Sequence, residues 1–84
     1  MPTRRVSPAV ATPLKEALTT SYWYKRDLRR FLEVATGEPG LIARLDWDGY
    51  KRRVVSDLVD ALFRDQHRNF DSLVRLIVAT AEIV

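Results

Sequence analysis

The 84-residue sequence contains no cysteine and a single histidine, His67. The absence of cysteine excludes disulfide bonds, a thiolate zinc site and a cysteine nucleophile. One histidine leaves almost nothing from which to build a catalytic triad or a multi-histidine metal site. We therefore expect no enzymatic activity, no catalytic residue, no metal site and no cofactor.

Long apolar segments are also missing. The stretch over residues 76–81 is far too short to span a bilayer, and Arg4 and Arg5 are not followed by the apolar segment of a signal peptide. We expect a cytoplasmic protein that makes no contact with a membrane.

Apolar residues make up 46% of the chain and charged residues 30%, with a net charge of +3. This balance is typical of a small folded domain, and the charge excess is modest for a dedicated nucleic-acid binder. The low glycine and proline content, three and four residues, argues against a disordered or fibrous chain.

The first half of the chain predicts a leader and two helices. Residues 1–11 are expected to be a flexible leader, and Thr12 with Pro13 is expected to start a helix that ends near Thr20. A second amphipathic helix is predicted from Tyr22, ending at Gly37. Its apolar stripe consists of Tyr24, Leu28, Phe31, Leu32 and Ala35.

The second half predicts three further helical segments. These are a short turn over residues 41–45, a helix capped by Asp46 and running to Phe63, and a last helix after a polar turn at residues 65–69. The core stripe expected for the last helix consists of Phe70, Leu73, Val74, Ile77 and Ala81. No strand pattern is present, so the fold class expected is an all-α, compact bundle of about five helices.

The last helix is expected to have a second working surface, because Leu76 and Ile83 lie away from its predicted core stripe. It also reaches Val84 without a glycine cap or a polar tail. We therefore expect residues 12–84 to be the N-terminal domain of a longer protein, with weak self-association through Leu76 and Ile83.

Two basic clusters lie on the second and fourth predicted helices. They are Lys25, Arg26, Arg29 and Arg30, beside Tyr22, and Lys51, Arg52 and Arg53. Aromatic rings beside arginines are able to stack bases while the cations hold phosphates. Interspersed acids such as Asp27 and Asp57 favour instead an ordinary charged surface with local ion pairs.

Two further groups have a structural interpretation. Asp46 and Asp48 flank Trp47 and contain the material of an acid–base pair, but at a helix start they are expected to cap the helix. His67 is expected to face solvent.

Several segments follow one another in a characteristic order. They are LKEAL (14–18), the Arg26-Asp27-Leu28 step with Phe31 and Leu32, the Leu41-Ile42-Ala43 turn, VVSDLVDAL (54–62) and the final helix over 73–81. In this order they resemble the effector-associated domain family, which consists of death-fold-like helical adaptor modules in bacterial conflict and signalling proteins.

The resemblance implies a non-catalytic adaptor that binds a homotypic helical domain on an effector. The expected partner-binding residues are Arg26, Arg29, Arg30, Tyr22, Lys51, Arg52, Leu76 and Ile83. The alternative is a helical nucleic-acid-binding module of a defence nuclease or helicase that uses the two basic clusters.

Overall fold

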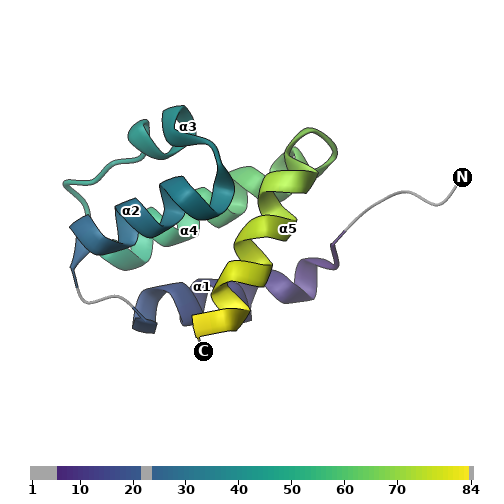
Figure 1. The fold of residues 1–84 in the computed structure, drawn as a ribbon, viewed down its shortest axis with the longest axis horizontal. Helices are drawn as coiled ribbons and strands as arrows, with labels where there is room; N and C mark the ends of the chain where they lie inside the picture. The colour runs from purple at the N-terminus through teal and green to yellow at the C-terminus, as the bar shows by residue number, and fades with distance from the viewer. Residues whose placement is uncertain (1–5, 22–23, 84) are drawn as a thin grey trace, which may run out of the picture.

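The computed structural model describes residues 6–21 and 24–83. Within these ranges the protein consists of helices and contains no strand (Figure 1). The elements are η1 (Pro8–Val10), α1 (Ala11–Ser21), α2 (Lys25–Thr36), α3 (Pro39–Ala43), α4 (Lys51–Arg64) and α5 (Gln66–Ile83). The all-α fold class and the expectation of about five helices are confirmed.

One hydrophobic core joins the helices. Helix α4 packs against α1 and α5, and α2 packs against α5 and α3. The core consists of Leu14, Leu18, Leu28, Leu32, Ala35, Ile42, Val55, Leu58, Val59, Leu62, Leu73 and Leu76. These apolar side chains lie on the inward stripe of each amphipathic helix, and burying them is the main force that holds the bundle together.

The leader is shorter than expected. Ser7 caps η1 by accepting a hydrogen bond from the Ala9 amide at 3.3 Å, and α1 begins at Ala11 rather than after Thr12. The backbone N–H of Val6 donates to Oε1 of Gln66, and the Val6 carbonyl accepts from Nε2 of the same side chain at 3.2 Å. Val6 thereby packs against the core, so residues from Val6 onward belong to the fold.

Helix α2 ends as predicted and begins later than predicted. Gly37 takes the left-handed conformation, with φ 67°, and its N–H donates to the Glu33 carbonyl. Tyr24 precedes the helix in extended backbone and is 68% exposed, so the prediction that it belongs to the core was wrong. Helical spacing to Leu28 does not apply to Tyr24, because the residue lies outside the helix.

Asp46 does not cap α4, which begins five residues later at Lys51 after Tyr50. The Asp46 side chain accepts a hydrogen bond from the Asp48 amide at 3.2 Å, and its carbonyl accepts from Gly49. Aspartate often bonds to the backbone two residues ahead in this way, which forms a turn instead of a helix start.

Helix α5 differs most from its prediction. It begins at Gln66, inside the segment expected to be a turn, and Asn69 has non-helical dihedrals that mark a kink. The predicted core stripe and the observed buried face share Leu73 and otherwise differ, although both follow helical spacing. Leu73, Leu76 and Thr80 face the core, and Ala81 is exposed. The expectation that Leu76 projects away from the core was therefore wrong, since Leu76 is completely buried.

Candidate functional site

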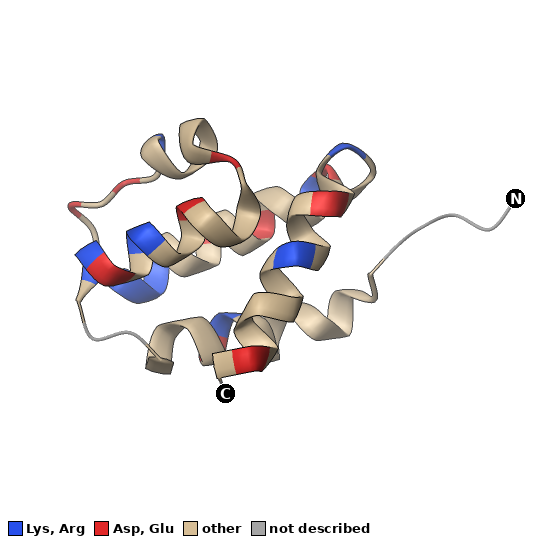
Figure 2. Cartoon of the chain, in the orientation of Figure 1, with Lys and Arg blue, Asp and Glu red and all other residues tan. Residues whose placement is uncertain are grey.

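Both predicted basic clusters lie at the same end of the molecule. Helices α2 and α4 begin at the left-hand end in Figure 1, and their first turns carry the blue segments there in Figure 2. We call this surface the basic end. It consists of Lys25, Arg26, Arg29, Arg30, Lys51, Arg52 and Arg53, with Tyr24, Trp47 and Tyr50.

The two helices of the basic end start with the same tripeptide. Tyr-Lys-Arg occupies positions 24–26 and 50–52, and in each case the tyrosine is the N-cap residue. Tyr24 is 68% exposed and Tyr50 is 85% exposed. Neither side chain caps its helix. The exposure of these two tyrosines was not predicted from the sequence. The repeated Tyr-Lys-Arg tripeptide is the sequence signal that could have indicated it.

Trp47 contacts both the start of α2 and the loop that precedes α4. Its indole N–H donates to the Ile42 carbonyl at 2.8 Å, which fixes the loop before α4. The Lys25 ammonium donates to the Trp47 carbonyl at 3.0 Å, and the Arg29 guanidinium carbon lies 5.6 Å from the ring centroid. This distance allows a cation–π contact. These contacts of Trp47 join the first turns of α2 to the loop before α4.

Some of the cations are already paired. Arg29 forms an ion pair with Glu33 at 3.1 Å, and Arg53 lies 4.0 Å from Asp57. In the part of the chain that the structure describes, Arg26, Arg30 and Arg52 are exposed and have no ion-pair partner. These three guanidinium groups are consequently available to an external carboxylate or phosphate.

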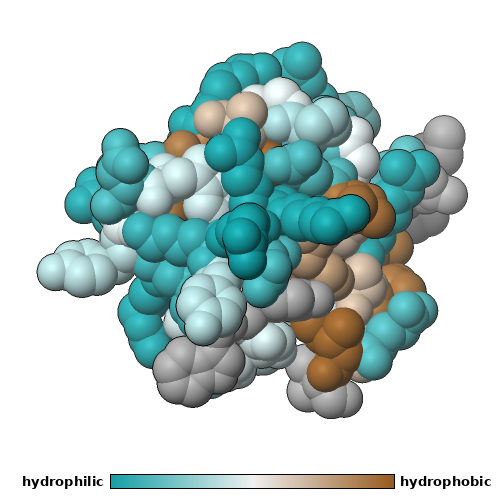
Figure 3. All heavy atoms as spheres, turned by 60° about the vertical axis from the view of Figure 1, so that its left-hand side comes forward, coloured by the Kyte–Doolittle hydropathy of each residue, from teal (hydrophilic) through white to brown (hydrophobic). Residues whose placement is uncertain are grey.

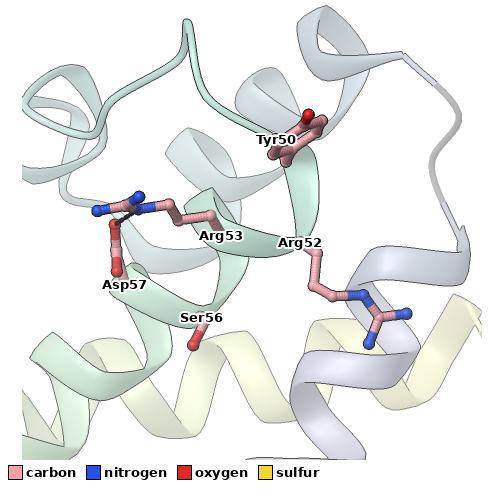
Figure 4. Close-up of a pocket in the computed structure, with 5 residues that line it drawn as sticks. All are labelled: Tyr50, Arg52, Arg53, Ser56 and Asp57. Carbon is pink, nitrogen blue, oxygen red and sulfur yellow. Dashed lines mark ion pairs between the residues drawn. The ribbon is translucent and has the colours of Figure 1, made fainter.

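Two open hollows lie on the basic end. One, of 220 Å³, is lined by Lys25, Arg26, Arg29 and Trp47. The other, of 510 Å³, lies on the outer face of the first turns of α4. It is lined by Tyr50, Arg52, Arg53, Ser56 and Asp57 (Figure 4).

A further hollow of 270 Å³ involves α3 and the segment between α4 and α5, and its lining is of mixed charge. It contains Glu38, Leu41, Arg44, Asp65, Arg68 and Asn69.

The structure brings together five of the eight predicted partner-binding residues. Arg26, Arg29, Arg30, Lys51 and Arg52 share the basic end. Tyr22 lies outside the described residues.

The two apolar residues of the prediction have different outcomes. Leu76 is buried, which excludes it from direct contact with a partner in this fold, whereas Ile83 is 41% exposed. Other exposed apolar side chains are Val34 at 80% and Val78 at 52%. In Figure 3 most of the visible surface is hydrophilic and one hydrophobic patch lies at the lower right.

The single histidine lies at the start of α5. His67 is exposed, as expected. Over residues 6–21 and 24–83, no group of three His, Asp or Glu side chains could hold a metal ion. None of the helices described here is long and apolar enough to cross a membrane. The arrangement is able to bind an anionic surface through guanidinium groups and aromatic rings.

Comparisons with known proteins add no relative. No protein-family model, no curated protein and no solved structure matches the chain.

Proposed function

We propose that the chain is a non-catalytic protein-interaction module that binds its partner through the basic end. The observation that carries this proposal is the composition of that exposed surface, which combines five exposed arginines with Tyr24, Tyr50 and the half-buried Trp47. Arginine, tyrosine and tryptophan are the residues that contribute most binding energy in protein interfaces.

The distribution of acidic residues favours a protein partner over nucleic acid. Five carboxylates, those of Asp27, Glu33, Asp46, Asp48 and Asp57, lie in the same two segments as the seven cations. A polyphosphate would be repelled by several of these groups, whereas a protein surface is able to match both signs of charge. Interspersed charge of this kind sets the register and the choice of partner.

The partner that we propose is a homotypic helical domain of an effector in a bacterial defence or signalling system, in the cytoplasm. Support comes from the resemblance to effector-associated domains and from the five-helix fold. In this proposal the effector performs the chemistry, and the module described here selects the effector.

The proposal is tested with charge-reversal variants of the chain as bait in lysate of its own host. We expect wild-type protein to retain an effector that Arg26→Glu/Arg30→Glu fails to retain. Arg29 is a poorer choice for reversal, because it is engaged with Glu33 and Trp47. Retention should be insensitive to nuclease.

Arg44→Glu/Arg68→Glu is the matched control, since it makes the same change of charge at two exposed positions away from the basic end. The control should retain the same effector as the wild type. Equal retention by all three baits would contradict the proposal.

Nucleic-acid binding is the second candidate function, and the exposure of Tyr24 and Tyr50 beside unpaired arginines favours it. Both rings are accessible for base stacking. Titration against single- and double-stranded DNA at two salt concentrations separates the candidates. Phosphate-driven affinity falls steeply with salt, by about one power of ten in affinity per power of ten in salt for each phosphate contact.

A further inference from the structure

The larger hollow of the basic end is an open depression with side chains on three sides. In Figure 4 the Tyr50 ring lies above it, the Arg53–Asp57 pair lies on one side, and Arg52 extends on the other. Ser56, one turn after Arg52, lines the hollow at the lower edge of this view. A serine at this position leaves the space between the two arginine side chains unfilled.

The lining combines apolar walls with charged tips. The Tyr50 ring and the aliphatic stems of Arg52 and Arg53 provide apolar surface, since long basic side chains keep only their ends in water. The volume of this open hollow, 510 Å³, is sufficient for a single side chain. An aromatic side chain would fit the hollow, stacking on Tyr50 and beneath a guanidinium group.

The charges around the hollow indicate which kind of residue should flank the aromatic side chain in the partner. Arg53 is engaged with Asp57, whereas Arg52 has no ion-pair partner in the described part of the chain. A carboxylate next to the aromatic group would meet the free guanidinium of Arg52.

We propose that this hollow binds an aromatic side chain within an acidic peptide segment of the partner. The inference rests on the proposed function and specifies the chemistry of the partner at one position. Arg52 supplies the charge that attracts the segment, Tyr50 supplies the stacking surface, and Ser56 supplies the space.

Fluorescence anisotropy with a short labelled peptide, Glu-Asp-Phe-Glu-Asp, tests the proposal on the full chain. The same peptide with serine in place of phenylalanine measures the contribution of the aromatic ring, and an oligothymidine of similar charge tests nucleic acid. We expect the phenylalanine peptide to bind at least about fivefold more tightly than the serine peptide.

Three variants and one control locate the binding. Arg52→Glu should weaken the phenylalanine peptide about tenfold or more, because it replaces an attraction by a repulsion. Ser56→Phe, which fills the hollow, and Tyr50→Ala, which removes its upper wall, should each abolish the preference for phenylalanine. Arg68→Glu, at an exposed position elsewhere, should leave binding close to wild type.

The outcomes distinguish this inference from the proposed function. If Arg52→Glu and Arg26→Glu/Arg30→Glu weaken binding but the two peptides bind equally well, the basic end is a binding surface and the aromatic pocket is refuted. If no variant changes binding, both proposals fail. Tighter binding of the oligothymidine, lost in Ser56→Phe, would overturn the choice of a peptide as the ligand.

Discussion

Leu58 and Arg52 lie on the same helix and have different surroundings. Leu58 is completely buried, whereas Arg52 is exposed and unpaired among the described residues. The same division holds on α2 between Leu28 and Arg26. At the scale of single residues, the side chains that stabilise the fold are therefore separate from those offered to a partner.

Leu58→Ala should lower the free energy of unfolding by about 2–5 kcal/mol, because it removes a buried side chain and leaves a cavity. Val34→Ala is the control, since Val34 is 80% exposed on α2 and its truncation should change stability by less than about 0.5 kcal/mol. Urea unfolding followed by circular dichroism measures both. Similar losses for the two variants would contradict the assignment of the core.

At the scale of elements, local signals predicted some boundaries and tertiary contacts decided the others. The end of α2 was predictable because Gly37 adopts a conformation that glycine favours. The start of α4 was not, because the Asp46 carboxylate bonds within its own loop. The face of α5 was misassigned because apolar residues lie on more than one side of this helix, so helical spacing alone fits two faces. Packing against the other helices buries the face of Leu73, Leu76 and Thr80.

The candidate site, like the helix boundaries, was only partly predictable from local sequence signals. The basic clusters were visible in the sequence, but their placement at the same end of the molecule was not. It involves a contact between residues 22 positions apart, in which the Trp47 carbonyl accepts a hydrogen bond from the Lys25 ammonium. Periodicity along one helix carries no information on such a contact. It also could not place Tyr24, which precedes its helix.

Gly37→Ala should destabilise the protein by about 1–2 kcal/mol, because φ of 67° is unfavourable for a residue with a Cβ. The added carbon would also lie 3.0 Å from an Arg75 guanidinium nitrogen. Gly40→Ala in α3 is the matched control, where the nearest atom is 4.0 Å away and alanine favours the helix. The account would be contradicted if thermal melting ranked Gly40→Ala as the less stable variant.

The contact between Gln66 and Val6 joins the start of α5 to the segment before η1. Gln66 is buried, at 6% exposure, and its side-chain amide bonds both backbone groups of Val6. Gln66→Ala leaves these groups without their partner and should cost about 1–3 kcal/mol. Hydrogen exchange should show faster exchange at the Val6 amide in the variant. An unchanged rate would indicate that the amide is protected by another contact.

At the scale of the whole molecule, the fold is complete without a ligand. The radius of gyration is 12.0 Å, close to the value of about 12 Å expected for a compact domain of this length. No buried side-chain N or O atom in the described part of the chain lacks a hydrogen-bond partner. Within the described residues, Arg26, Arg30 and Arg52 of the basic end form no ion pair and remain available for binding.

The central claim is that the unpaired arginines serve binding and not folding. The triple variant Arg26→Glu/Arg30→Glu/Arg52→Glu tests it most directly through its free energy of unfolding in urea. Three exposed substitutions should together change this quantity by less than about 1.5 kcal/mol.

Two of the new carboxylates would lie in the first turns of α2 and α4, where the helix dipole favours negative charge. We therefore predict a folded, helical variant with nearly wild-type stability. A loss of more than about 3 kcal/mol would show that these arginines hold the fold together, and it would contradict the account.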